Sequence, residues 1–277
     1  MTRNLKMQWF LLLHKKELYI CFTIMIILAI GSFFTECLYY FKLDYSELHS
    51  SDMLFYLRAY NYTYHGIMIT LYPLLVVIPF ADSYLIDEHF NIIPIIKTRT
   101  KIEHYYLSKM LFVFVSAFII LLIPQLLNVL LNAITFPASV IGDFTNGQYG
   151  RNYVYALAEF AYPKLFDSHP NLYNLLFICI FAIVGSLIAT IVYCFSFYFR
   201  KSRLFIICLY FLVSHTVMLI NLWANLPIDI DINTYLFACN ASLKKSDEFF
   251  IAYIIGCVLL ITILSRATIL RFRKQII

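Results

Sequence analysis

The sequence predicts an all-α integral membrane protein with six transmembrane helices. Of its 277 residues, 62% are apolar and only 13% are charged, whereas ordinary soluble domains have about 45–50% apolar and about 25% charged residues. The apolar residues recur in long runs, and a helix needs about 20 of them to cross the hydrocarbon core of a bilayer. Only seven residues are Gly and eight are Pro, so this excess is not fibrous or low-complexity sequence. The lipid bilayer is therefore the expected solvent of this chain.

Each apolar run is expected to be a helix, because a helix satisfies its own backbone hydrogen bonds in lipid. The third run contains Pro124, which is tolerated where neighbouring helices satisfy the carbonyl that it frees. The connections between the runs are too short for a second domain, so residues 1–277 are expected to form a single transmembrane domain. The six predicted spans are approximately residues 18–40, 65–84, 107–133, 172–198, 204–223 and 249–269.

The distribution of basic residues predicts the orientation of the chain. Fifteen of the 21 Lys and Arg residues lie in the N-terminal segment, in the segments after the second and fourth predicted spans, and near the C-terminus. Because Lys and Arg are retained on the cytoplasmic side, both termini are expected there. The many Ile, Lys, Phe and Tyr residues favour the plasma membrane of a bacterium. Cys37 and Cys239 both fall near the predicted outer face, where a disulfide between them is one alternative.

Several classes of function do not fit this sequence. The net charge of +5 is carried by short clusters between apolar runs, so nucleic acid is not an expected partner. The predicted spans contain no paired Asp residues or HExxH sequence of the kind that hydrolysis within a membrane requires. The seven cysteines show no CxxC or Cys/His spacing of a metal site. We therefore expect no catalytic residue, metal ion or cofactor bound by this chain.

Residues 81–110 interleave charged and apolar residues at near-helical spacing, which is typical of a segment that lies on a membrane surface or docks on a protein. An acidic pair is followed by an apolar run from 92 to 96, then by polar, basic and aromatic residues. This order resembles the loop between the second and third spans of type-2 ABC exporter permeases. The residues that carry the resemblance are Asp87, Glu88, Asn91, Thr98, Arg99, Lys101, Tyr105, Tyr106, Ser108 and Lys109.

The resemblance also covers the six-span layout and an N-terminal amphipathic helix, which Leu5, Trp9, Leu12 and Leu13 match in part. It implies that residues 85–106 contain a cytosolic coupling helix, which sits in a cleft of a separate ATP-binding cassette ATPase subunit. The residues implied in this contact are Asp87, Glu88, Asn91, Thr98, Arg99 and Lys101.

Asn91 stands where the family usually has Gly, which implies a residue in the left-handed conformation; Asn tolerates it best after Gly. The resemblance further implies a permease dimer, formed with a second copy or a paralogue, that exports an amphipathic peptide, antibiotic or lipid. The chain lacks a GxxxxGK[ST] loop, so ATP and Mg²⁺ are expected on the partner subunit. The alternative for residues 85–106 is a solvated, charged loop that obeys the positive-inside rule.

Polar residues inside the predicted spans are candidates for a transport path, because they are costly in lipid. Gln125, Asn128 and Asn132 are spaced three and four apart, so they share one helical face. With His215 of the fifth span they are the candidate substrate-cavity residues. The alternative is that the amides bond to neighbouring helices as packing contacts, and that His215 is a hydrogen-bonded interior residue. Glu36 is expected to reach the headgroup layer.

Two other functions stay open. A secondary transporter or channel would usually carry a charged residue or a Gly-broken helix at mid-bilayer, and the predicted spans lack these. A membrane scaffold or immunity protein without transport activity needs no such feature. On the fourth span, Gly185 with Ala189 and Ala182 with Ser186 form pairs of small residues, which predict close packing between helices.

Overall fold

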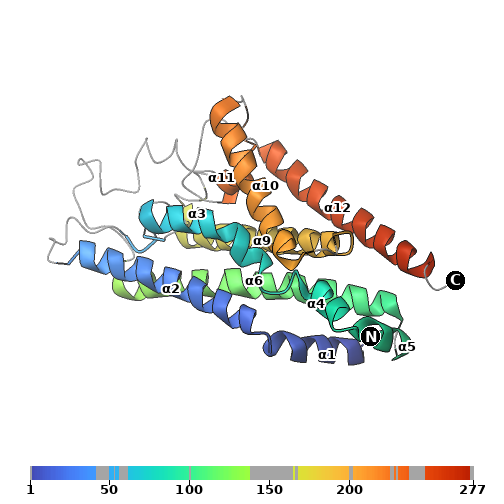
Figure 1. Cartoon of the computed structure of the whole chain (residues 1–277). Coiled ribbons are helices and arrows are strands. Elements are labelled where there is room, and N and C mark those ends of the chain that lie inside the picture. The colour runs from blue at the N-terminus through green and yellow to red at the C-terminus, as the bar shows by residue number, and fades with distance from the viewer. Residues whose placement is uncertain are drawn as a thin grey trace.

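The computed structural model of the chain describes residues 2–41, 50–52, 54–55, 62–99, 101–137, 165, 168–199, 202–224, 228, 230–236 and 247–274. All regular structure in these ranges is helical (Figure 1). The helices are α1 (Thr2–Leu13), α2 (Lys16–Tyr39), α3 (Tyr62–Val77), α4 (Ser83–His89), α5 (Ile92–Arg99), α6 (Ile102–Thr135), α9 (Pro170–Ser196), α10 (Arg203–Ala224), α11 (Ile232–Leu236) and α12 (Asp247–Lys274).

Five of these helices are long and apolar enough to cross a membrane, which makes this chain a multi-pass membrane protein. They are α2, α6, α9, α10 over Leu204–Ala224 and α12 over Glu248–Leu270. Each coincides with a span that the sequence predicts. The all-α class is thus confirmed for the described residues, and five of the six predicted spans coincide with helices that could cross a membrane.

The prediction for the second span, residues 65–84, is wrong in its extent. Helix α3 ends at Val77, and its apolar part, Gly66–Val77, is shorter than the other spans. At 1.5 Å per residue, the 16 residues of α3 extend about 24 Å. Residues 78–82 then turn, with Asp82 and Ser83 bonded to other helices. The predicted end at residue 84 is based on hydropathy, which depends on residue type and contains no information about these tertiary contacts.

Helices α6 and α9 form the centre of the molecule. In the most apolar 18-residue stretch of α9, 61% of the residues are buried, whereas the corresponding shares for α10 and α12 are 11% and 6%. A Cβ atom at Gly185 of α9 would lie 2.3 Å from Cδ1 of Leu121 on α6 and 3.0 Å from the hydroxyl of Tyr72 on α3. The predicted close approach at the small residues is therefore confirmed at Gly185.

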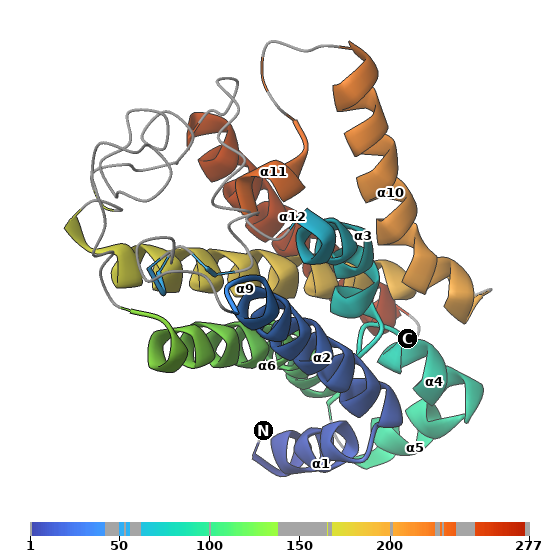
Figure 2. The ribbon, with the colours of Figure 1, turned by 90° about the vertical axis from the view of Figure 1, so that its left-hand side faces the viewer.

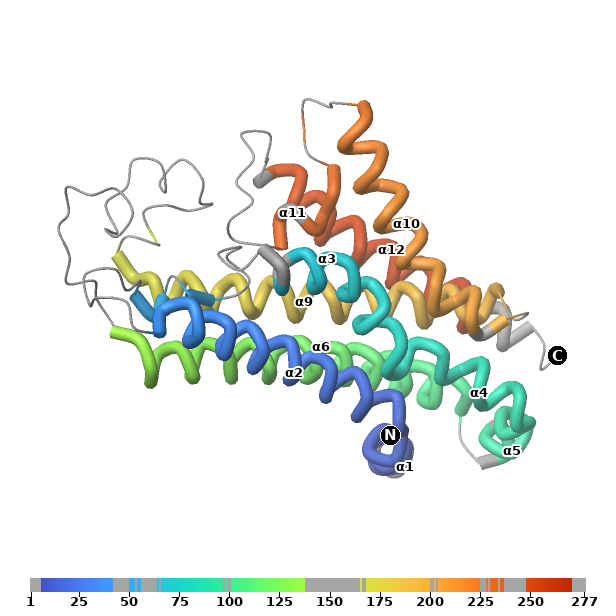
Figure 3. The backbone as a smooth tube through the Cα atoms, turned by 60° about the vertical axis from the view of Figure 1, so that its left-hand side comes forward, coloured from blue at the N-terminus to red at the C-terminus, as the bar shows by residue number. Residues whose placement is uncertain are grey.

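The arrangement of the helices gives the molecule two distinct ends. Helix α6 lies beside both α2 and α9, and α10 packs on α3 and α9 and then diverges from α9 (Figure 2). The N-terminus, the C-terminus and the helices α4 and α5 lie at one end, which we call the α5 end (Figures 1 and 3). Helices α2 and α6 run away from this end and α9 returns to it, so their other ends meet at what we call the far end.

Candidate functional site

The candidate site lies at the α5 end and begins with a tight turn between α4 and α5. Helix α4 ends at His89, and the backbone N–H of Asn91 donates to the carbonyl oxygen of Glu88 at 3.1 Å. Asn91 has a φ of 53°, which lies in the left-handed region that disfavours most residues with a Cβ atom. This confirms the conformation predicted for Asn91 and explains how the chain reverses direction within two residues.

Helix α5 has one face packed on the protein and one face exposed. Ile93 and Ile96 are buried, whereas Phe90 and Ile95 are 68% and 56% exposed, and Ile92 is also exposed. We call Phe90, Ile92 and Ile95 the α5 patch. The patch lies outside the long helices that can cross a membrane, where exposed apolar side chains grouped in one short segment are candidates for an interaction site.

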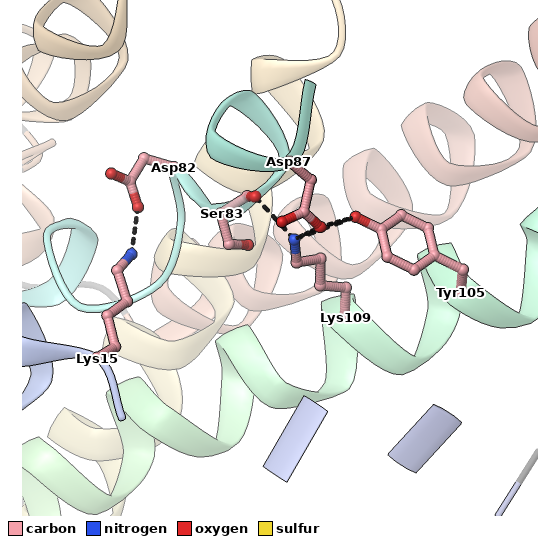
Figure 4. A network of polar contacts seen from close by, with 6 residues as sticks. All are labelled: Lys15, Asp82, Ser83, Asp87, Tyr105 and Lys109. Atoms are coloured by element: carbon pink, nitrogen blue, oxygen red, sulfur yellow. Dashed lines mark hydrogen bonds and ion pairs between the residues drawn. The ribbon is translucent and has the colours of Figure 1, made fainter. Parts of the chain in front are cut away.

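A buried lysine lies beneath this helix pair. Lys109 of α6 is 1% exposed, and its ammonium group donates to the carbonyl oxygen of Ser83 at 2.7 Å, to the Asp87 carboxylate and to the Tyr105 hydroxyl at 3.1 Å. The Tyr105 hydroxyl in turn donates to Asp87. All three donors of the ammonium group are therefore used. The ion pair between Lys109 and Asp87 joins α4 to α6 (Figure 4).

A second ion pair joins the N-terminal helices to the same region. Lys15, between α1 and α2, donates to the Asp82 carboxylate at 2.6 Å, and its Nζ lies 5.2 Å from the ring centroid of Phe80. The side chains of Lys15 and Asp82 are 10% and 0% exposed. We call the six residues of Figure 4 the polar junction: Lys15, Asp82, Ser83, Asp87, Tyr105 and Lys109.

Aromatic contacts extend the junction to α9. The ring of Tyr84 on α4 stacks on Phe197, just after the end of α9, with centroids 3.8 Å apart. Tyr106 of α6 packs edge-on against Phe197 at 4.8 Å and stacks on Tyr193 of α9 at 5.6 Å. Helix α4 is therefore held by α6 and α9 together. A displacement of α4 and α5 must move both central helices or break these contacts.

The structure separates the predicted coupling residues into two groups. Asp87 faces the interior and bonds to Lys109 and Tyr105, so it is not part of the docking surface that the resemblance implied. Asn91, Thr98 and Lys101 are exposed, Glu88 is half-buried, and Arg99 lies in the last turn of α5. The hydroxyl of Thr98 donates to the carbonyl of Ile95 at 2.8 Å, which completes that turn.

Five members of the junction were not predicted as site residues: Lys15, Asp82, Ser83, Tyr105 and Lys109. The two lysines fitted the positive-inside count, and Tyr105 and Lys109 entered only as part of the family pattern. A signal was present, because Lys109 lies inside a long apolar helix and a charge there needs a partner. Asp82, at the end of an apolar run, carries the same signal.

The candidate cavity residues of α6 contact other parts of the chain. Gln125, Asn128 and Asn132 are all fully buried. Nδ2 of Asn128 donates to the carbonyl of Ala29 on α2 at 2.9 Å, and Nδ2 of Asn132 donates to the carbonyl of Leu54 at 3.2 Å. These bonds favour the packing alternative over a substrate cavity.

The remaining sequence predictions fall elsewhere in the structure. His215 lies on α10, which packs against α3 and α9, and its Nδ1 contacts the carbonyl of Phe211 at 2.9 Å. The hydrogen bond of the packing alternative is therefore present, but His215 is half-buried and does not lie fully in the interior. Glu36 is buried, so the expectation that it reaches the headgroup layer is wrong. Cys239 lies outside the described residues.

A separate apolar groove lies between α9, α10 and α12. Its volume is about 340 Å³, and it is lined by Ile188, Ile191, Val192, Tyr210, Tyr253, Gly256, Cys257 and Leu260. Two phenol groups at Tyr210 and Tyr253 are the polar elements of an otherwise apolar lining. A groove of this composition can accept an apolar or amphipathic molecule.

Within the described part of the chain, no group of three or more His, Cys, Asp or Glu residues is placed to hold a metal ion. No protein-family model, curated protein or solved structure matches this chain.

Proposed function

We propose that this chain is the transmembrane permease subunit of an ATP-driven ABC exporter. The observation that carries the proposal is the construction of the α5 end, where an exposed apolar patch on α5 sits on a buried, charged junction. A surface loop that only obeys the positive-inside rule needs neither feature. An exposed patch supplies a seat for a partner, and a rigid base supplies a means of transmitting its movement.

In this proposal a separate ATP-binding cassette subunit grips α5 through Phe90, Ile92 and Ile95. ATP and Mg²⁺ bind to that subunit, which supplies the phosphate-binding loop. Closure of two ATPase subunits then displaces α4 and α5. Breaking a buried ion pair costs on the order of 3–5 kcal/mol, so the Lys109–Asp87 contact transmits this displacement to α6 before it breaks.

The same reasoning gives the orientation and the assembly. The α5 end, with both termini, faces the cytoplasm of a bacterial cell, and α3 with its adjoining turn provides the sixth crossing. Helices α10 and α12 present largely exposed apolar faces, which meet lipid or the second permease, a further copy of the chain or a paralogue. The groove between α9, α10 and α12 fits an amphipathic cargo such as a peptide, an antibiotic or a lipid.

Copurification tests this proposal. The tagged chain, extracted gently from its own host, should carry an ATPase subunit in a stoichiometric amount. The double variant Phe90→Ala/Ile95→Ala should lose most of this ATPase, because it removes the exposed apolar surface and leaves the buried face of α5 intact. The matched control is Phe10→Ala on α1, which removes an aromatic side chain that is 61% exposed outside α5.

Three outcomes would count against the proposal. The first is an ATPase that binds the patch variant and the wild type equally well. The second is a chain that moves substrate in liposomes without any partner, which is the behaviour of a secondary transporter. The third is a chain that copurifies with no ATPase at all, as expected of a scaffold or an immunity protein.

A further inference from the structure

A short segment crosses the far end of the central helices. It comprises residues 50–52 and 54–55, and we call it the strap. Figure 3 shows it in light blue beside the ends of α2, α6 and α9. Leu54 and Phe55 are 1% and 0% exposed, and Ser50 and Asp52 are also buried. The strap is therefore part of the interior although it lies outside every helix.

Two amide side chains hold the backbone of the strap. Nδ2 of Asn132 on α6 donates to the carbonyl of Leu54 at 3.2 Å, and Nδ2 of Asn174 on α9 donates to the carbonyl of Asp52 at 3.1 Å. The N–H of Ser51 donates to the carbonyl of Pro137 at 2.9 Å. One segment thus closes the space between the end of α6 and the beginning of α9.

Apolar contacts attach the strap to α2 as well. Leu54 clusters with Tyr40 and Phe136, and Phe33 packs against this group. Phe136 lies edge-on to Phe33 and to Tyr40, with ring centroids 6.5 Å and 5.9 Å apart. Asn132 and Asn174 together with this cluster fix the strap to α6 and α9, the two central helices, and to α2 beside them.

The hydrogen bonds fix which way the two amides point. A backbone carbonyl can only accept, so each Asn must present its nitrogen to the strap and its oxygen elsewhere. Oδ1 of Asn132 and Oδ1 of Asn174 are buried and have no hydrogen-bond partner within the described ranges, and the same holds for Oγ of Ser50. Each such acceptor penalises the closed arrangement.

We propose that the strap is a movable outer closure of the helix bundle, latched by Asn132 and Asn174. Apolar contacts and the two amides keep it shut, while hydration of these three buried oxygens favours its release. These opposing contributions make the closure sensitive to a small movement of α6 against α9. This inference rests on the proposed function for its orientation, in which the far end is the outer face, and for the ATP-driven motion that lifts the strap.

Cysteine accessibility at Leu54 tests the closure. Leu54→Cys is exposed in sealed membranes to a maleimide that cannot cross lipid, and labelling at position 54 is read by mass spectrometry. The reference is Phe41→Cys, at a residue of the same end that is 69% exposed. At rest, position 54 should label at least about tenfold more slowly than position 41, because burial blocks the reagent.

Removing the latch should expose the strap. In the background of Leu54→Cys, the double variant Asn132→Leu/Asn174→Leu leaves two strap carbonyls buried without donors, so labelling should accelerate several-fold. The control is Ser186→Ala on α9, whose buried hydroxyl donates to its own helix at Ala182 and should leave the rate unchanged. A short thiol cross-linker between Leu54→Cys and Phe136→Cys provides a test that does not depend on the folding of the double variant.

Nucleotide provides the last arm of the experiment. In the complex with its ATPase, trapping of nucleotide should accelerate labelling at position 54, and the cross-link should suppress turnover until the linker is cleaved. Equal resting rates at positions 54 and 41, or an unchanged rate in the double variant, would overturn the latch. In a complex that hydrolyses ATP, a labelling rate at position 54 that does not change when nucleotide is trapped would also overturn the latch. If no ATPase binds, the proposed function fails, and the resting and double-variant rates still decide the latch.

Discussion

Lys109 and Asp87 show at the scale of single residues why the base of α5 is rigid. A lysine with all three donors satisfied inside a protein is stable only while its partners remain, because the low dielectric of the interior magnifies an unpaired charge. The carboxylate of Asp87 also accepts from Tyr105. The junction therefore behaves as one unit, and its members are not interchangeable with surface charges.

Replacing Lys109 by Met should destabilise the protein by about 3–5 kcal/mol, because it leaves the Asp87 carboxylate buried without its cation. The midpoint of thermal unfolding in detergent should fall by on the order of 10 °C. Lys101→Met, at an exposed position eight residues earlier, is the matched control and should change the midpoint by less than about 2 °C. Similar midpoints for the two variants would contradict a structural role for Lys109.

The double variant Asp87→Leu/Lys109→Met removes both charges and leaves neither partner stranded. Its loss of stability should be much smaller than the sum of the two single losses, because replacing a buried ion pair by apolar residues is often close to neutral. A double-mutant cycle measures this coupling. Additive losses would mean that the two side chains act independently.

The turn at Asn91 gives a prediction about backbone conformation. Asn91→Gly should keep or slightly raise stability, since Gly adopts a positive φ without steric cost. Asn91→Val should lower it by on the order of 1–2 kcal/mol, because a β-branched residue is strained in the left-handed region. The two midpoints of thermal unfolding provide the comparison, and a reversed order would argue against the positive φ.

At the scale of elements, the packing of α9 on α6 depends on a residue without a side chain. The Cβ that Gly185→Ala adds would lie 2.3 Å from Cδ1 of Leu121, so the variant should lose about 1–3 kcal/mol through overpacking. Gly256→Ala on α12 is the control, because a Cβ there meets nothing within 4 Å. Unfolding in detergent should separate the two, and equal stability would rule out close contact at Gly185.

The limits of sequence reasoning also appear at this scale. Helices α2, α6, α9, α10 and α12 are predictable because an apolar run of sufficient length has one stable form in lipid. The ends of α3 are not, because Lys15 and Lys109, distant in sequence, bind the residues just after it. The left-handed turn at Asn91 was predictable from the family pattern. The inward direction of Asp87 was not, because it depends on bonds to Tyr105 and Lys109. Hydropathy depends only on residue type, whereas the direction of a side chain depends on the residues that it contacts.

At the scale of the whole molecule, the proposed topology requires an even number of crossings, with α3 among them. Cysteines at Phe10, which is exposed, and at Lys274, the last residue of α12, should therefore react with a membrane-impermeant maleimide from the cytoplasmic side only. Phe41→Cys should react from the outer side only. Reaction of positions 10 and 274 from opposite sides would show that α3 does not cross, and would remove the basis for placing α5 in the cytoplasm.

The shortness of α3 has a consequence for the surrounding lipid. Helix α3 extends about 24 Å in total, and its apolar part is shorter still, so it creates a hydrophobic mismatch beside a hydrocarbon layer of about 30 Å. Lipids next to its exposed residues, such as Ile67, must shorten, or headgroups and water must dip toward Asp82. This local thinning would make the protein sensitive to acyl-chain length, so its behaviour in thick and thin bilayers should differ even though no lipid is recognised chemically.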